Sequence, residues 1–144
     1  MTERTVKQII EGHAPITAPA STTVHDAARL RSERNIGALL VVDGEKLVGI
    51  FTERDALFRV LAHGLDVKTT QLSSVMTANP QTIPPTSAFT TALQMMHEGR
   101  YRHLPVVEDG RVIGIVSVRD ALGPELESFV YELLRHEQMQ QVLA

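Results

Sequence analysis

The chain has 144 residues, of which 43% are hydrophobic and 22% charged, and its formal net charge is −3. This composition is typical of a globular protein with one domain or two small repeats, and a weakly negative chain has no general attraction for nucleic acid. Cysteine is absent and aromatic residues make up 4% of the chain, which excludes thiol chemistry and argues against a surface that stacks nucleic-acid bases.

The first residues, MTERTVKQII, contain charges and no long apolar core, so they do not resemble a signal peptide. No later apolar run approaches the roughly 20 residues that cross a bilayer. We therefore expect a cytoplasmic protein whose partners include neither a membrane nor a nucleic acid. Within this segment, Val6, Ile9 and Ile10 predict a short helix that packs on the rest of the protein.

The main feature of the chain is an internal repeat. Residues 15–57 align with residues 80–122 without a gap, and 14 of the 43 aligned pairs are identical. Just upstream, Val6–Ile10 and Leu72–Met76 correspond after a slip of one residue. Two similar segments of this length predict two copies of one folding unit.

Each copy predicts the same order of elements, β-α-β-β-α. A short extended segment comes first, followed by hydroxyl residues that can cap a helix, by that helix, by a hairpin and by a second helix. The capping hydroxyls are expected at Ser21-Thr22 and Thr86-Ser87, and the second helices are expected to begin at Thr52 and Ser117.

The first helix of the second copy has an apolar face formed by Phe89, Ala92, Leu93 and Met96, at the spacing of one helix side. In the first copy Arg31 stands at the last of these positions, so we expect a weaker apolar face there. The hairpin strands are ALLVV and LVGIF in the first copy and HLPVV and VIGIV in the second. The turn glycine shifts by one place between DGEK and EDGR, so the two turns are expected to differ in type.

The small sheet of each copy has an apolar face that one copy alone could hardly bury, which predicts an α+β fold with the two copies packed sheet to sheet. An additional amphipathic helix is expected over residues 124–143. We expect it to cover the core or a dimer seam, with docking of a larger partner as the alternative. Its apolar stripe comprises Leu126, Phe129, Val130, Leu133 and Leu134.

The nine-residue segments GIFTERDAL and GIVSVRDAL end the two hairpins. One interpretation is structural: Thr52 with Asp55, and Ser117 with Asp120, form capping boxes, and the acidic residues complement the helix dipole. The other interpretation is functional. Free N–H groups and a hydroxyl at a helix start suit a phosphate, and an ionised carboxylate can accept both hydrogens of a ribose diol.

Neighbouring residues extend the functional interpretation. Arg54 and Arg119 can reach phosphate oxygens, in a bidentate way if the angle allows. Gly49 and Gly114 lie inside strands, where glycine often marks a close approach of the backbone, and a flat base could occupy that gap. None of these residues forms a pair of nucleophile and base.

The duplicated unit, with LLVVDGEKLVGIFTERD and LPVVEDGRVIGIVSVRD, resembles a pair of cystathionine-β-synthase (CBS) domains, also called a Bateman module. The resemblance covers roughly residues 5–123 and suggests one domain over 8–66, a second over 74–131 and the extra helix over 124–143. It implies a pseudo-two-fold sandwich of the repeats with two clefts that often hold AMP, ADP, ATP, NAD(H) or S-adenosylmethionine. It also implies a homodimer shaped as a flat disc.

The resemblance further implies a role for each signature residue. The aspartates would hold the ribose, the Ser or Thr and the arginine before the aspartate would line the phosphate, and the base would lie near the first short strand. The start of the second strand would supply a basic phosphate ligand. The ligand-binding residues implied are Thr17, Ala18, Gly37, Ala38, Thr52, Arg54, Asp55, Thr82, Ile83, Arg102, His103, Ser117, Arg119 and Asp120.

The two copies differ at the start of that strand. Arg102 and His103 of the second copy correspond to Gly37 and Ala38 of the first, so we expect the two clefts to differ in affinity or ligand. We also expect a phosphate near Arg102, His103 and Arg119. The six histidines show no zinc-like spacing, and neither a metal site nor a required cofactor is expected.

The leading hypothesis is a non-catalytic regulatory module that binds an adenine nucleotide and is read by a protein partner not visible in the sequence. The first alternative is a structural interaction module whose clefts stay empty. The second is an enzyme in which Asp55 and Asp120 act as acid and base, although the repeat is expected to place them in separate clefts.

Overall fold

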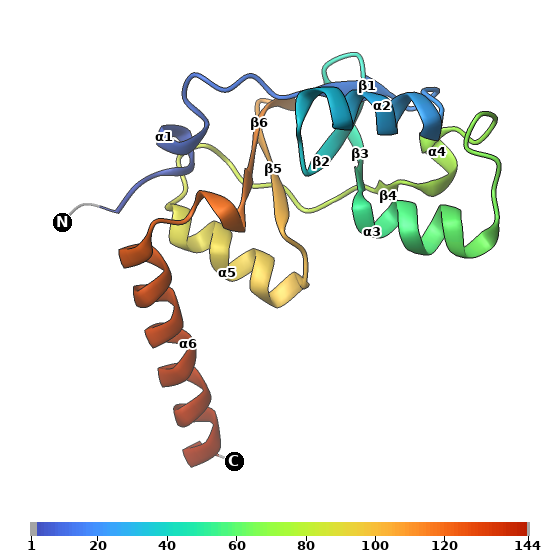
Figure 1. Cartoon of the computed structure of the whole chain (residues 1–144). Coiled ribbons are helices and arrows are strands. Elements are labelled where there is room, and N and C mark those ends of the chain that lie inside the picture. Colours follow the sequence, from blue (N-terminus) through green and yellow to red (C-terminus); the bar gives the residue numbers. More distant parts are fainter. Residues whose placement is uncertain (1–2, 144) are drawn as a thin grey trace.

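The structure is a computed structural model that describes residues 3–143, with side chains as far as residue 139. The two copies lie side by side, with the first at one end of the molecule and the second at the other (Figure 1). The first copy comprises β1 (Thr17–Pro19), α2 (Val24–Arg34), β2 (Ala38–Asp43), β3 (Lys46–Thr52) and α3 (Glu53–Asp55), which continues through a π-helical turn (Ala56–Val60) and a 3-10 turn (Leu61–His63).

The second copy repeats this order with shorter edge elements. Ile83 bridges to Val106 in parallel, as β1 pairs with β2 in the first copy. The other elements of the second copy are α5 (Phe89–Gly99), β5 (His103–Glu108), β6 (Arg111–Ser117) and a 3-10 turn (Val118–Asp120).

The elements outside the two copies are α1 (Val6–Ile10) at the start of the chain, α4 (Leu72–Val75) and β4 (Thr77–Ala78) in the linker, and α6 (Gly123–Leu143) at the end.

The first sheet has the order β1-β2-β3-β4, and the second consists of β5 and β6. β2 and β3 are antiparallel, as are β5 and β6, and both hairpins have two-residue turns. Gly44 has a positive φ of 64° in the first turn, whereas both Asp109 and Gly110 have positive φ in the second. The expected difference between the turns is therefore confirmed, because only the second has the two left-handed residues of a type I′ turn.

The prediction of a helix that begins at Ser117 is wrong in the length of that helix. Instead of a helix, Val118–Asp120 form a single 3-10 turn, and the backbone is extended at Ala121. Pro124 lacks an N–H group and disfavours helical conformation in the residue before it, so a helix cannot run through this position. The helix restarts as α6, with Pro124 in its first turn.

Two of the expected helix starts are also displaced. The N-caps are Thr23 and Ala88 rather than the preceding hydroxyl pairs, and Ala88 has no capping side chain. Backbone carbonyls from distant segments satisfy the first free N–H groups instead. Val24 N–H donates to the carbonyl of Thr70, and Phe89 N–H donates to that of Arg4.

The short helix that precedes each copy packs on the other copy. Val6 of α1 is fully buried in the core of the second copy, where Phe89, Ala92, Leu93 and Met96 form the expected face of α5. Leu72 of α4 is fully buried in the core of the first copy.

Equivalent hydrogen bonds fix the two short helices. Val6 N–H donates to Ser87 O at 2.9 Å, and Leu72 N–H donates to Thr22 O at 2.9 Å. In Figure 1, α1 accordingly lies beside β6, and α4 lies at the opposite end of the molecule. The two copies are therefore linked by an exchange of helices as well as by the packing of their sheets.

This exchange corrects the interpretation of the strand glycines. A side chain at Gly49 would meet Met76, which follows α4, and a side chain at Gly114 would meet Ile10 of α1. The gaps beside these glycines are thus filled by apolar side chains, so a base does not occupy them. Each glycine is needed because the exchanged segment lies directly against the strand.

The sheets meet through a small core formed by Ala38, Leu40 and Ile50, with Ile115 packed against it. Val112 N–H donates to the carbonyl of Glu45 across this boundary. The two copies therefore pack sheet to sheet in a pseudo-two-fold α+β sandwich with an additional C-terminal helix, as the sequence predicted.

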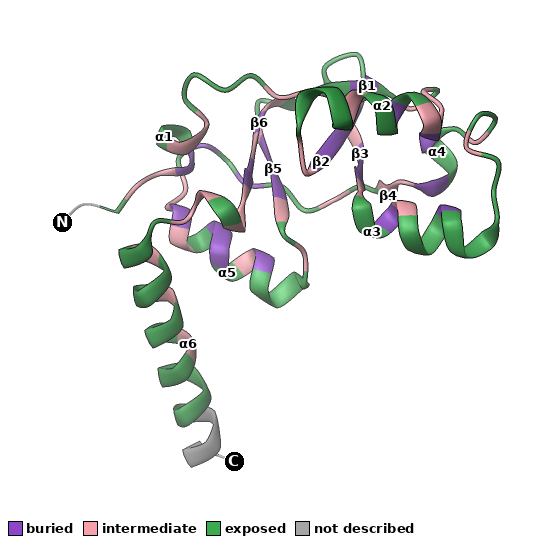
Figure 2. Ribbon diagram, viewed as in Figure 1, coloured by how far each residue is buried: buried purple, intermediate pink, exposed green. Residues whose placement is uncertain are grey.

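The C-terminal helix α6 projects away from both sheets (Figure 1). Phe129 packs against the second core and meets the His97 ring edge to face, with centroids 5.9 Å apart. Along the rest of the helix, the described side chains are mostly exposed (Figure 2), including Val130 at 49% and Leu134 at 54%. Most of the predicted apolar stripe is therefore not covered by the protein's own core.

Candidate binding site: an arginine-lined cleft between the repeats

A cleft of about 260 Å³ lies where the ends of the two hairpins face each other. Each copy contributes corresponding positions to its wall: Thr52 and Ser117 from the strand ends, and Arg54 and Arg119 from the turns that follow. The cleft therefore lies between the two repeats, and equivalent residues of both repeats form its wall. A ligand bound there would contact both copies at once.

The wall of the cleft is strongly positive. Arginine is the only basic residue type in it apart from His103, and Glu53 is its one acidic side chain among the residues that the structure describes. Glu53 is ion-paired with Arg31. Several guanidinium groups around one concave surface favour an anion, and their planar forks match phosphate oxygens. The arginines are Arg31, Arg54, Arg100, Arg102 and Arg119.

His103, the first residue of β5, lies over Gly37 of the other copy. A side chain at Gly37 would collide with the imidazole Nε2 where it now lies, so this glycine permits the close contact between the repeats. Burial lowers the pKa of His103 below its usual value, and the neighbouring charges of Arg102 and Arg119 lower it further. The imidazole is therefore neutral at pH 7 and adds no repulsion among the arginines.

Asp55 does not line the cleft. It is 6% exposed, and its Oδ2 accepts hydrogen bonds from the Thr52 N–H at 3.0 Å and the Thr52 hydroxyl at 3.1 Å. Its Oδ1 accepts one from the hydroxyl of Thr77, in the linker strand β4, at 3.0 Å, and Arg59 Nε lies 3.6 Å away. This carboxylate performs the capping-box role, and its oxygens are already occupied.

Asp120, like Asp55, is not among the residues that line the cleft, but it is less enclosed than Asp55. Its Oδ2 accepts a hydrogen bond from the Ser117 N–H at 2.8 Å, and its side chain is half-buried. No other hydrogen bond to this carboxylate is found within residues 3–143. The two signature aspartates therefore differ, although their sequences match.

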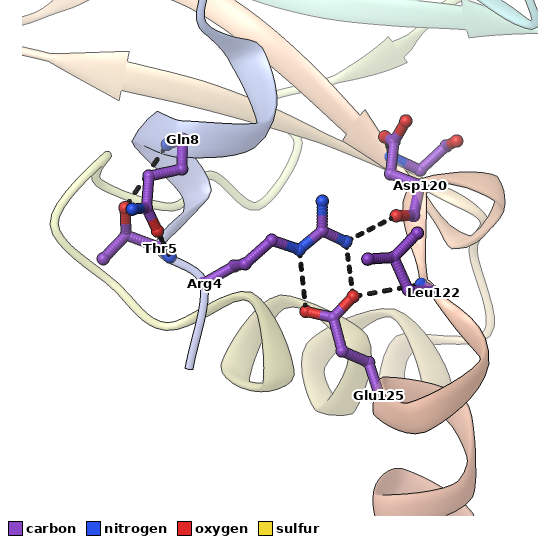
Figure 3. Close-up of polar contacts among 7 residues, drawn as sticks. Arg4, Thr5, Gln8, Asp120, Leu122 and Glu125 are labelled. Carbon is purple, nitrogen blue, oxygen red and sulfur yellow. Dashed lines mark hydrogen bonds and ion pairs between the residues drawn. The ribbon is translucent and has the colours of Figure 1, made fainter. Parts of the chain in front are cut away.

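Arg4 ties this region to the C-terminal helix (Figure 3). Its Nη2 donates to the main-chain carbonyl of Asp120 at 2.9 Å, and its Nε donates to Glu125 Oε2 at 3.1 Å. A second bond from Nη2 to Glu125 makes the ion pair bidentate. Glu125 Oε1 also accepts from the Leu122 N–H at 3.0 Å. The end of the second signature and the first turn of α6 thus share one arginine.

The expected base-contacting residues lie elsewhere. Thr17 and Ala18 border a shallow depression beside α2, separate from the arginine-lined cleft. Ala18 and Ile83 are buried at 5% and 1% exposure, and Thr82 is exposed outside the cleft. Ala38, the first-copy counterpart of His103, is also buried at 6% and does not line the cleft, whereas Gly37 does. The structure therefore gathers the residues expected to bind phosphate and leaves apart those expected to contact the base.

Two cleft residues, Arg31 and Arg100, are absent from the set expected from the sequence. In the sequence Arg31 appears only as an interruption of an apolar helix face. Arg100 belongs to a basic cluster with His97, Arg102 and His103, for which phosphate contact and a solvated helix end are equal alternatives. That Arg31 and Arg100 both line the same cleft depends on how the repeats pack. The sequence feature that could have identified Arg31 as a cleft residue is the difference between this arginine and the apolar Met96 at the equivalent position of the second copy.

Two further features of the described chain bear on its possible functions. Residues 3–143 contain no group of three or more His, Asp or Glu side chains placed to hold a metal ion. No helix in that part of the chain is both long and apolar enough to cross a membrane.

The family model described as CBS domain matches residues 6–62 and 72–124. The CBS domain-containing protein CBSCBSPB1 of Arabidopsis thaliana is 41% identical over 121 residues, which cover 83% of this chain and 22% of that protein. This chain thus spans about a fifth of the length of that relative.

Solved structures share the fold. The CBS-domain containing protein ATU1752 of Agrobacterium tumefaciens is 32% identical with a TM-score of 0.75, over 81% of this chain and 95% of that one. The CBS domain protein PAE2072 of Pyrobaculum aerophilum, complexed with AMP, has a TM-score of 0.79 over 89% of this chain and 99% of that one. It is 21% identical, so this likeness concerns the fold alone.

Proposed function

Because the chain belongs to the CBS domain family, we propose that it is a non-catalytic regulatory module that binds an adenine nucleotide in the cleft between its repeats. The observation that carries this proposal is the set of five arginines, drawn from both copies, around a cleft with one acidic side chain. Such a wall favours phosphate groups. The fold of PAE2072, which is complexed with AMP, is compatible with this ligand class.

The proposed ligand is AMP, ADP, ATP or a dinucleotide such as NAD(H). Its phosphate would lie between Arg102 and Arg119, beside the hydroxyl of Ser117 and the neutral ring of His103. Asp120 is the better candidate for the ribose hydroxyls, because the oxygens of Asp55 are engaged by the capping box and by Thr77. Differences between the two signatures would then make the two ribose positions unequal.

A bound nucleotide would hold the two copies together, since the cleft wall comes from both. It would therefore favour one relative packing of the repeats over others, and a protein partner that recognises that packing would respond to the nucleotide. The pose of α6, tied to Asp120 through Arg4, is a surface that such a partner could read.

A panel of AMP, ADP, ATP, NADH and S-adenosylmethionine, followed by thermal unfolding and calorimetry, tests the proposal. A ligand at a hundred times its dissociation constant should stabilise the protein by about 2.7 kcal/mol. Replacement of Arg102 by Ala should weaken binding about tenfold or more, because a charged hydrogen bond is lost. Arg29→Ala serves as control, since Arg29 is an exposed arginine paired with Glu33 outside the cleft. Absence of binding by every compound would contradict the proposal.

The second candidate is a structural interaction module without a small-molecule ligand. It is favoured by one observation: Asp55 has a complete set of internal partners and needs no ligand to explain it. The panel above separates the two candidates. An enzyme is less favoured, because the capping box engages the carboxylate that would have to act as acid or base.

Self-association is a further part of the proposal. The exposed apolar side chains of α6, among them Leu126, Val130 and Leu134, would lie at the seam of a homodimer. Sedimentation velocity should then give a dimer for the full chain, and Val130→Glu together with Leu134→Glu should give a monomer of unchanged helix content. A monomeric wild-type chain would contradict this assignment.

A further inference from the structure

Two cations of the cleft stand at positions where the repeats break their own symmetry. Arg31 of α2 occupies the place that Met96 holds in α5, and Met96 is buried in the second core. Arg31 instead reaches the cleft and pairs with Glu53. A methionine would continue the apolar face of the helix, so folding of the first copy does not require an arginine here.

Arg100 shows the same pattern at the end of the other helix. It is the C-cap of α5 with φ 59°, in the left-handed conformation, and its counterpart Asn35 caps α2 with φ 51°. Asparagine adopts this conformation readily, whereas an arginine does so at a cost in conformational energy. The first copy thus has Asn35, which suits the left-handed backbone, whereas the second copy has Arg100, which adds a positive charge to the cleft.

The hydrogen bonding of Arg31 is incomplete. Its Nε is buried and has no hydrogen-bond partner within the described part of the chain, although Nη2 pairs with Glu53. A buried donor without a partner is costly, and a guanidinium presents five donors to an anion. Solvent does not reach Nε, so a phosphate oxygen in the cleft would bind the remaining guanidinium donors of Arg31, which Glu53 alone leaves open.

The charge of the wall exceeds what one phosphate can neutralise. Five arginines face a single glutamate, whereas a phosphate monoester carries about −1.5 to −2 charges at pH 7. A monophosphate between Arg102 and Arg119 would leave Arg31 and Arg100 without an anionic partner other than Glu53. A chain of two or three phosphoryl groups extends the negative charge across the cleft to them.

We propose that Arg31 and Arg100 are specificity-determining residues that make the cleft select nucleoside di- and triphosphates over monophosphates. This inference rests on the proposed nucleotide-binding function and names the ligand class within it. The signature residues of both copies bind the nucleotide. The two arginines outside the signature increase the affinity when the nucleotide has a second or third phosphoryl group.

Calorimetry with AMP, ADP and ATP, at fixed ionic strength and without divalent cations, tests this selection. The wild type should bind ATP at least about tenfold more tightly than AMP, because each added charge-assisted hydrogen bond strengthens binding by that order. Inorganic tripolyphosphate should compete with ATP. Raising the salt concentration should weaken the binding of ATP more than that of AMP, since screening acts on every charge pair.

The sister repeat supplies the test variants. Arg31→Met and Arg100→Asn each install the residue of the other copy, so both positions keep a side chain that the fold accepts. Each should weaken ATP binding about tenfold and AMP binding less than about threefold. Arg29→Met, an exposed arginine of the same helix α2, should change neither. Circular dichroism and thermal unfolding establish that the variants are folded.

The possible failures are distinguishable. If AMP and ATP bind the wild type equally, or if the variants weaken both by the same factor, the selection by phosphate number is wrong while nucleotide binding stands. If the wild type binds no nucleotide, the proposed function and this inference both fall. The ratio of affinities in the wild type decides the matter even if a variant fails to fold.

Discussion

At the scale of single residues, the cleft combines several arginines with one histidine, His103, whose pKa their positive charges lower. His103 is surrounded by Arg31, Arg102 and Arg119, and only Asp120 acts in the opposite direction on its pKa. Burial is the largest cause of the lowered value. A neutral imidazole can still donate one hydrogen bond to an anion and accept another.

The unliganded protein should lose stability on acidification because of this residue. The pKa of His103 in the folded state lies below its ordinary 6.5, so near that pH the unfolded chain binds the proton more readily. Its contribution to stability is present above about pH 6.5 and is lost as the pH falls toward the folded pKa. Urea unfolding from about pH 7.5 to about pH 5.5 should show a steeper loss for the wild type than for His103→Gln. Parallel curves would contradict this role.

The sequence predicted the residue-level site in part. Thr52, Ser117, Arg54 and Arg119 could be placed at the cleft because the signature puts them at strand ends that a two-fold sandwich brings together. The engagement of Asp55 by Thr77 could not be predicted, since it depends on β4 of the linker pairing with β3. Whether the expected ribose and base contacts form remains a prediction.

At the scale of elements, the attachment of α6 depends on a few contacts at its first turn. Arg4 joins Glu125 to the main chain of Asp120, and Arg4 also lies over the Phe89 ring at 5.7 Å. The hydrogen bond from Arg4 lowers the pKa of Glu125, so the carboxylate is ionised at pH 7. A carboxylate at the first turn also interacts favourably with the helix dipole.

Glu125→Gln should loosen this attachment while keeping the shape of the side chain. We expect a loss of stability of about 1 kcal/mol, because one charge-assisted pair becomes a neutral hydrogen bond. Amide hydrogen exchange should accelerate over residues 122–129 and over the N-terminal residues next to Arg4. Glu127→Gln, an exposed residue of the same helix, is the matched control. If both variants exchange alike, Arg4 does not hold the helix.

The elements themselves were largely predictable from local patterns. The face of α5 and both hairpins follow directly from the spacing of apolar residues and from Asp-Gly and Gly turns. The extent of the helix after Ser117 was predicted wrongly, although Pro124, which stands where the first copy has Arg59, is a signal in the sequence that a helix cannot run through this position. Local propensity also gave no information on which copy α1 or α4 would cover.

At the scale of the whole molecule, the exchange of α1 and α4 determines how the two copies depend on each other. Val6 and Leu72 are both fully inaccessible to solvent, and each completes the core of the copy to which it does not belong in sequence. The sheets add a third shared core around Leu40 and Ile50. The cleft is therefore framed by two units that are interlocked rather than merely adjacent.

Neither half of this chain is a self-sufficient piece. Cleavage in the loop that follows Leu61–His63 would separate each core from the short helix that completes it. The first fragment would keep α1, which belongs in the second core, and the second fragment would keep α4, which belongs in the first core. Loss of either helix from its site exposes the core of the copy that it completes, so we expect the two copies to unfold in one cooperative transition. Whatever binds in the cleft thus acts on the integrity of the entire fold.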